Sequence, residues 1–275
     1  MFERRWERDL HQRPVLSDVA VADGHLVVHE RSTRLVSLAG ADGAVRWDVP
    51  LGTWPRAVVA DGADVFALPQ LPGRLCCLSA STGEPRWTAE VGWLTGHVAV
   101  GPEVVLVGGW RGDTPLRALD RATGSLLWSR TSPTVLPAWF DGGFLVGRPG
   151  GRRVELVNPG TGAVERTWRR TVPDAEPVFD VSAAGVTVGG RPLGTTAARI
   201  TPLPRPASGE RVVGSAGLAD LLVTLDNAGH LECFAPDGAR LARTRVARRA
   251  VGLRVLGPGR IAVLGKGTVV VYDVG

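Results

Sequence analysis

Short apolar runs alternate with polar turns along the chain, and the same order of runs and turns repeats. In one repeat the run Arg56–Ala60 leads to an Asp61-Gly62 turn and then to a second run, Val65–Leu68. A third run, Leu75–Leu78, leads to a Thr82-Gly83 turn. Such turns favour hairpins because glycine accepts positive φ and Asp or Thr can bond the local backbone. The pattern predicts four short antiparallel strands in each repeat.

The number of repeats follows from their second strands. Seven such strands are expected: Leu26–Val28, Val65–Leu68, Val104–Val107, Phe144–Val146, Val186–Val188, Leu221–Leu225 and Ile261–Leu264. The chain stops after a third strand, whereas its start, Arg4–Glu7, resembles the fourth strand Val45–Asp48. We therefore expect the N-terminal strand to complete the last repeat, which closes a ring and removes exposed sheet edges.

A tryptophan returns every 40 or 41 residues, at Trp6, Trp47, Trp87, Trp128 and Trp168. A fixed period of this size is typical of repeat proteins. In three repeats the tryptophan follows a glycine by four residues, as Trp128 follows Gly124. In the next repeat Arg166 occupies that position after Gly162, and Trp168 comes two residues later.

The segment Ala118–Trp128, with the sequence ALDRATGSLLW, resembles the tryptophan-docking motif of the quinoprotein-type β-propellers, often called PQQ-like repeats. Leu75–Trp87 and Leu35–Trp47 match it more loosely. The resemblance implies an all-β, seven-bladed β-propeller of four-stranded antiparallel blades, with residues 1–275 forming a single domain. It also implies that four tryptophans dock onto the glycine turn of a neighbouring blade: Trp6, Trp47, Trp87 and Trp128.

A quinone cofactor is not expected, although the chain contains adjacent cysteines. The quinone-dependent dehydrogenases of this family are much larger, hold Ca²⁺ and carry a disulfide between adjacent cysteines. Here Cys76 and Cys77 lie within a predicted strand, where successive side chains point to opposite faces. Cys233 occupies the position of Cys77 in a later repeat, which favours a small core residue. No carboxylate cluster has Ca²⁺ spacing, so we expect neither cofactor nor metal.

The charge and hydropathy of the chain argue against nucleic acids and membranes as its partners. The net charge is +5, and Lys266 is the only lysine, so arginine carries nearly all the positive charge. The arginines are scattered, whereas nucleic-acid binders concentrate charge and interleave aromatic side chains. No apolar run reaches the roughly 18 residues of a membrane span, and the N-terminus lacks a signal-peptide core. These features favour a cytoplasmic monomer without nucleic-acid or membrane partners, unless a leader has been removed.

Two groups of residues are candidates for a site. Trp54, Trp93, Trp110 and Arg111 fall in loops expected on one propeller face, away from the docking positions. They form either a recognition surface or caps over the hydrophobic edges of their own blades. The second group is polar residues among the small residues of the expected inner strands: Asp18, Arg56, His97, Asp180 and Arg254.

Two functions remain open from the sequence. The first is a scaffold that binds a protein or peptide on the loop-bearing face. The alternative is a small-molecule pocket in the central funnel, with His97 and Asp180 as acid–base residues of a cyclase, lyase or hydrolase type. There, Arg56 or Arg254 would hold an anion and the loop tryptophans would stack on the ligand. Structural ion pairs explain the same polar residues, so whether the chain is an enzyme stays undecided.

Overall fold

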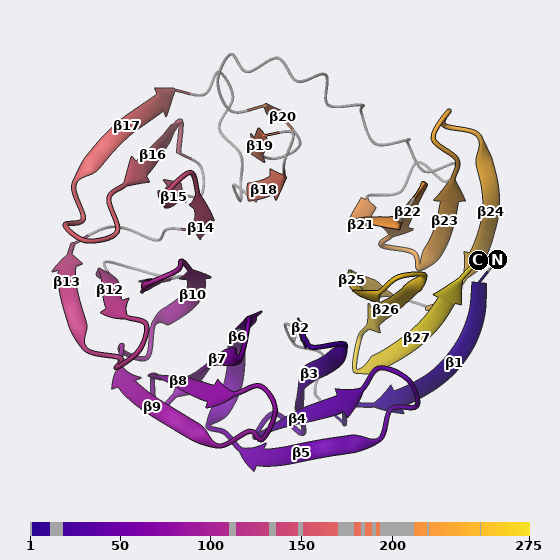
Figure 1. The fold of residues 1–275 in the computed structure, drawn as a ribbon, viewed down its shortest axis with the longest axis horizontal. Coiled ribbons are helices and arrows are strands. Elements are labelled where there is room, and N and C mark those ends of the chain that lie inside the picture. The colour runs from indigo at the N-terminus through magenta and orange to yellow at the C-terminus, as the bar shows by residue number, and fades with distance from the viewer. Residues whose placement is uncertain are drawn as a thin grey trace. The chain divides into compact units, whose positions relative to one another are not determined.

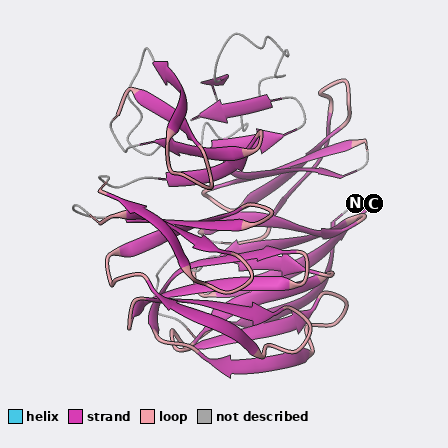
Figure 2. Cartoon of the chain, turned by 60° about the vertical axis from the view of Figure 1, so that its left-hand side comes forward, coloured by secondary structure: helices cyan, strands magenta, loops and turns pink. Residues whose placement is uncertain are grey.

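The computed structural model describes residues 2–11, 19–109, 114–131, 136–147, 151–169, 179–182, 185–188, 191–192, 212–218, 220–247 and 249–275. In these ranges the regular secondary structure consists of strands alone, as Figure 2 shows. The all-β prediction is therefore confirmed for the described residues. Asp18, Trp110 and Arg111 lie outside them.

The strands form antiparallel sheets within two compact units. Unit 1 comprises Met1–Leu51, Ala80–Gly83 and Pro202–Gly275, and unit 2 comprises Gly52–Ser79 and Glu84–Thr201. Unit 1 contains three four-stranded sheets (Figure 1). In order across each sheet they are β2(Val19–Ala22)-β3(His25–Glu30)-β4(Arg34–Ala39)-β5(Val45–Pro50), β21(Val212–Leu218)-β22(Leu221–Asp226)-β23(His230–Phe234)-β24(Arg240–Arg245) and β25(Ala250–Gly257)-β26(Arg260–Gly265)-β27(Thr268–Val274)-β1(Phe2–Asp9).

Unit 2 contains three further four-stranded sheets and a fourth sheet with three described strands. They are β6(Thr53–Asp61)-β7(Asp64–Leu71)-β8(Arg74–Ser79)-β9(Pro85–Glu90), β10(Thr95–Val100)-β11(Val104–Gly109)-β12(Leu116–Asp120)-β13(Leu126–Arg130), β14(Leu136–Phe140)-β15(Gly143–Gly147)-β16(Arg153–Val157)-β17(Val164–Arg169) and β18(Phe179–Ser182)-β19(Gly185–Val188)-β20(Arg191–Pro192).

The first strand of the chain belongs to the last sheet. β1 pairs antiparallel with β27, from Phe2 opposite Val274 to Asp9 opposite Thr268. Asp273 on β27 binds Arg5 of β1 and Arg260 of β26. Hydrogen bonds, first from Arg260 and then from Arg5, hold the pKa of Asp273 below its ordinary value. The predicted completion of the last sheet by the N-terminal strand is confirmed.

Where burial is described, the second and third strands of a sheet are buried more deeply than its outermost strand. Every residue of β11 is buried, whereas on β13 and β9 buried positions are replaced by exposed and half-buried ones. The apolar faces of neighbouring sheets share cores. Phe66 and Leu68 pack with Val105 and Val107 in unit 2. Because the second strands have apolar residues on both faces, they read in sequence as continuous runs and not as alternating ones.

The four predicted docking tryptophans all reach the turn of the next sheet. The indole nitrogen of each donates a hydrogen bond to a carbonyl three residues before the glycine of that turn. The pairs are Trp6 to Gly40 (3.1 Å), Trp47 to Ala80 (2.8 Å), Trp87 to Arg121 (2.9 Å) and Trp128 to Pro159 (2.6 Å). A Cβ on the glycine would lie 2.5–2.9 Å from the ring, at Gly43, Gly83, Gly124 and Gly162. Glycine is therefore required for the ring to lie on the backbone.

Trp168, which follows its glycine by six residues instead of four, behaves as that spacing predicts. Arg166 pairs with Leu156, which is the docking register, and Trp168 pairs with Val154 one step further. The guanidinium of Arg166 lies over the Trp168 ring at 5.5 Å. This repeat thus places a cation and a displaced ring where the others place one docking tryptophan.

Candidate functional site

Three large apolar side chains are exposed on neighbouring loops of unit 2. Trp54, at the start of β6, is 53% exposed, and Trp93, in the β9–β10 loop, is 58% exposed. Leu71, at the end of β7, is 41% exposed. We refer to these residues as the Trp54–Leu71–Trp93 surface. Isolated exposed apolar residues are common, but a group of them on adjacent loops is typical of a binding surface.

Close backbone packing brings the three loops together. Thr53 pairs with Leu71 across β6 and β7. A Cβ on Gly73 would lie 2.7 Å from the backbone nitrogen of Trp93, and the amide of Val91 donates to the Gly73 carbonyl at 2.9 Å. The backbones of the three segments are therefore packed against one another.

The backbone of Trp54 has an unusual conformation. Its φ is +59°, in the left-handed region that bulky residues rarely adopt. The conformation costs about 1–2 kcal/mol for a residue with a side chain. Strained residues of this kind concentrate at functional sites.

Arg56 lies close enough to His97 for its charge to act on the imidazole. Arg56 Nε donates to Gln70 Oε1 at 2.9 Å, and Gln70 is buried. Burial, and secondarily the positive charge of Arg56, lowers the pKa of His97 to about 4. His97 is therefore neutral at pH 7 and is a weak base, which reduces the support for acid–base chemistry.

Two other candidate residues have described backbones or contacts elsewhere in the chain. Arg254 belongs to unit 1, where its Nε donates to the Val19 carbonyl at 2.9 Å. The backbone of Asp180 pairs with Thr187 on β19, but its side chain lies outside the described part. A pairing of His97 with Asp180 therefore stays a prediction.

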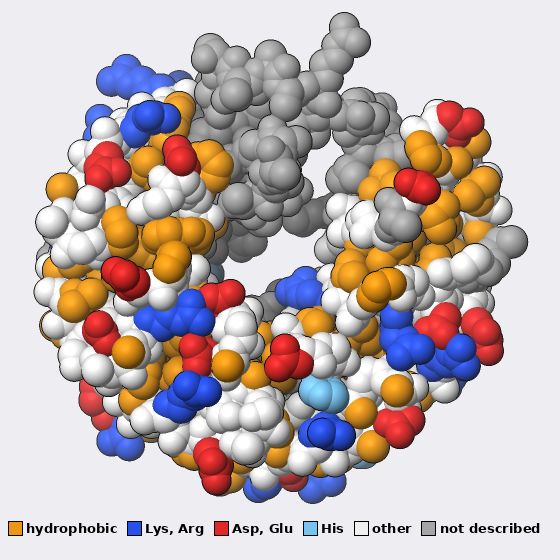
Figure 3. Space-filling model, viewed as in Figure 1, with side chains coloured by type: hydrophobic (Ala, Val, Ile, Leu, Met, Phe, Trp, Pro, Cys, Tyr) orange, Lys and Arg blue, Asp and Glu red, His pale blue; other side chains and the backbone are white. Residues whose placement is uncertain are grey.

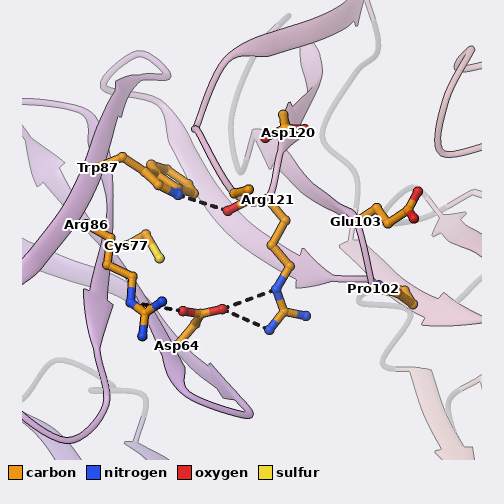
Figure 4. A pocket seen from close by; sticks show the side chains of 9 residues that line it. Asp64, Cys77, Arg86, Trp87, Pro102, Glu103, Asp120 and Arg121 are labelled. Carbon is orange, nitrogen blue, oxygen red and sulfur yellow. Dashed lines mark hydrogen bonds and ion pairs between the residues drawn. The ribbon is translucent and has the colours of Figure 1, made fainter.

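A pocket of about 470 Å³ opens between two sheets of unit 2, beside the docked Trp87 (Figure 4). Arg121 crosses it from the β12–β13 turn. One guanidinium nitrogen lies 3.0 Å from Asp64 Oδ2, and the other contacts Asp61 Oδ2 at 2.5 Å and the Gly101 carbonyl at 3.1 Å. Arg86 approaches the same Asp64 at 3.4 Å. The cluster ties adjacent sheets together.

Arg121 could not be recognised from the sequence pattern. It stands where Gly40, Ala80 and Pro159 stand in the other docking turns, so it departs from the repeat. Its partners Asp61 and Asp64 precede it by 60 and 57 residues. Cys77 lines the same pocket, and burial, followed by the charge of Asp64, raises the pKa of its thiol to about 12. The thiol is protonated at neutral pH, which supports its predicted core role.

Replacing Arg121 with alanine is expected to lower the free energy of unfolding by about 2 kcal/mol, because Asp64 keeps its charge in a mostly buried position without its main partner. Urea denaturation followed by tryptophan fluorescence measures this. Arg74→Ala is the matched control, since its pair with Glu90 is exposed on both sides and contributes below about 1 kcal/mol. Equal losses from the two substitutions would contradict the bridging role of Arg121.

Charges of both signs are mixed over the surface. On the face shown in Figure 3, basic and acidic side chains lie next to one another, with no single-sign stripe. Several are paired, such as Arg8 with Glu30 at 2.9 Å and Arg34 with Asp48 at 2.6 Å. Among the described residues, no three His, Cys, Asp or Glu side chains are grouped to hold a metal ion. The described part also contains no helix long and apolar enough to cross a membrane.

Solved structures with the same arrangement define the class of protein. BamB from Moraxella catarrhalis superimposes with a TM-score of 0.55 at 17% identity, covering 99% of this chain and 100% of that one. The computationally designed Ika8 protein superimposes with a TM-score of 0.71 at 13% identity, covering 97% of this chain and 98% of that one. The WD40 domain of Neurospora crassa Pan2 superimposes with a TM-score of 0.69 at 11% identity, covering 99% of this chain and 95% of that one. With the docking tryptophans, these likenesses define a β-propeller of PQQ-like repeat type.

The family follows from the sequence match. Residues 3–62 and 51–193 match the family described as outer membrane protein assembly factor BamB, which is more than half of the chain. The chain belongs to this family, so the resemblance to PQQ-like repeats is confirmed. No curated protein sequence matches the chain.

Proposed function

We propose that the chain is a non-enzymatic scaffold, a seven-bladed propeller that binds a protein or peptide partner through the Trp54–Leu71–Trp93 surface. Seven sheets in the described residues, and the pairing of β1 with β27, support seven blades closed by the N-terminal strand. The family description, an assembly factor, and the likeness to a WD40 domain are consistent with partners that are proteins.

The observation that carries the proposal is the exposure of two tryptophans and a leucine on loops fixed against each other. Tryptophan is enriched among the residues that contribute most to protein interfaces. A rigid surface loses little conformational entropy when a partner binds, which favours affinity. Trp54 also combines a left-handed backbone with a half-exposed indole, and strained residues of this kind concentrate at functional sites.

The test begins with the full chain as bait in its source cells and identification of the proteins that co-purify. Affinity for the purified partner is then measured for the double variant Trp54→Ala, Trp93→Ala. We expect binding to weaken by about 100-fold, corresponding to roughly 3 kcal/mol for two central aromatic contacts.

Leu241→Ala is the matched control, because Leu241 is 52% exposed on β24 and lies away from this surface in sequence and sheet. It should leave affinity unchanged. A partner that binds the double variant as tightly as the unaltered chain, or that loses as much affinity with Leu241→Ala, would exclude this surface. Melting temperatures of all variants confirm that the fold is retained.

A further inference from the structure

Unit 1 contains a separate pocket of about 390 Å³ at one end of its last sheet. Three segments form it: strand β1, the β24–β25 loop, and the β26–β27 turn with the start of β27. Its apolar part is Val246, Ala247 and Val270, and its polar part is Glu7, Arg249, Lys266 and Thr268. A lining that combines an apolar floor with a few polar groups is compatible with a small-molecule site.

The backbone fixes the two cations of this pocket next to each other. The β25–β26 ladder ends with Ala250 opposite Gly265, so Arg249 and Lys266 follow as the next facing residues. The amide of Lys266 donates to the Arg249 carbonyl at 3.2 Å. Both side chains then line the same cavity. Their proximity is therefore a property of the strand register and not of flexible side chains.

The β24–β25 loop is held in place by backbone contacts with Gly229. The amide of Val246 donates to the Gly229 carbonyl at 2.8 Å, and a Cβ on Gly229 would lie 2.0 Å from the Ala247 carbonyl oxygen. Only glycine allows this contact, and its φ of +87° requires glycine as well. The apolar floor is thus anchored to the neighbouring sheet.

The charge of the pocket is positive. Glu7 is paired with Arg4, which neutralises it. Among the described residues, neither Arg249 nor Lys266 takes part in an ion pair with an acidic side chain, and both are exposed. Two cations held side by side with no such partner repel each other, and an anion between them removes that repulsion.

The single lysine of the chain stands at this position. Of the 32 basic residues, Lys266 alone is not arginine, although arginine serves elsewhere on the surface. Lysine supplies a compact point charge, whereas arginine supplies a broad planar fork. Lys266 stands between Gly265 and Gly267 with its backbone bonded to Arg249, so the two side chains offer a compact and a planar donor to an oxyanion that enters the pocket.

We propose that this pocket binds a small organic anion, with its apolar body on Val246, Ala247 and Val270 and its carboxylate or phosphate group between Arg249 and Lys266. Thr268 supplies a hydroxyl at the rim. The site lies wholly in unit 1, so it is independent of the Trp54–Leu71–Trp93 surface of unit 2.

The unique lysine makes the test selective. An amine-acetylating reagent modifies only Lys266 and the α-amino group of the full chain, and mass spectrometry of peptides follows each rate. The probes are phenyl phosphate and benzoate. Each has an aromatic body, and they carry a phosphate group and a carboxylate group, respectively. We expect one or both to slow Lys266 acetylation about fivefold, with Kd about 1 mM, as suits a small ligand in an open site. The α-amino group should be unaffected.

Two further probes test whether the site needs both an anionic group and an apolar body, because each of them carries only one of the two. Inorganic phosphate and benzyl alcohol should each protect Lys266 less than the combined probes. Arg249→Gln should abolish protection, whereas Arg245→Gln, an exposed arginine on β24 that does not line the pocket, should leave it intact. The proposal fails if both combined probes, at roughly 10 mM, leave Lys266 acetylation unchanged, if Arg249→Gln keeps full protection, or if inorganic phosphate protects equally well.

Discussion

Gly124→Ala is expected to lower the free energy of unfolding by about 4 kcal/mol. The φ of Gly124 is +74°, and an alanine Cβ would lie 2.5 Å from Trp87 Cε3. The left-handed backbone accounts for about 1–2 kcal/mol, and displacing the indole accounts for the rest. The displaced indole also loses its 2.9 Å hydrogen bond to the Arg121 carbonyl. Urea denaturation of the full chain measures the change.

A second glycine separates backbone strain from the tryptophan contact. Gly142 has nearly the same φ, +76°, and a Cβ there would meet nothing within 4 Å. Gly142→Ala should therefore cost only the backbone term of about 1–2 kcal/mol. If both variants lose the same stability, the docked indole contributes little and the explanation of the repeat period is wrong.

Deletion of residues 2–9 is expected to abolish cooperative folding of unit 1. The deletion removes seven paired positions along β27 and exposes that strand as a new edge. It also removes Trp6, which packs against the core that includes Leu26, Leu38 and Val269. Hydrogen exchange of the β26 and β27 amides should show loss of protection, while thermal unfolding of the remaining chain broadens.

Restoring the strand from outside tests the same point. A synthetic peptide of residues 1–11 should return protection to β27, and the same peptide with Trp6→Ala should do so more weakly because it cannot dock on Gly43. A truncated chain that unfolds as sharply as the full chain, with β27 amides still protected, would show that β1 is dispensable.

The sequence predicted the docking tryptophans because their period and their glycines are both local signals. Trp128 and Gly162 are in contact although they are far apart along the chain, yet each belongs to a recognisable repeat unit. Arg166 shows the same logic, since counting from Gly162 placed it correctly in the docking register. Repeats convert long-range contacts into a pattern that can be read along the chain.

What the sequence could not provide was anything that departs from the repeat. Arg121 finds its acidic partners in another sheet, and no spacing rule connects them. Leu71 was not singled out from the sequence, because the exposure of a side chain depends on how the surrounding segments fold. His97 was singled out as a polar residue of an inner strand, but burial gives it a pKa far from that of a typical catalytic base. The polar site is therefore the part least determined by pattern.

The pairing of β1 with β27 determines how the molecule responds to mechanical tension. Phe2 faces Val274 at one end of an antiparallel ladder, so a pull on residues before Phe2 and after Val274 acts on the first rung alone. The ladder then opens rung by rung, as in a zipper, toward Asp9 and Thr268. Tethering through both ends would therefore detach the first strand under low force, whereas tethering through interior turns would strain many hydrogen bonds at once.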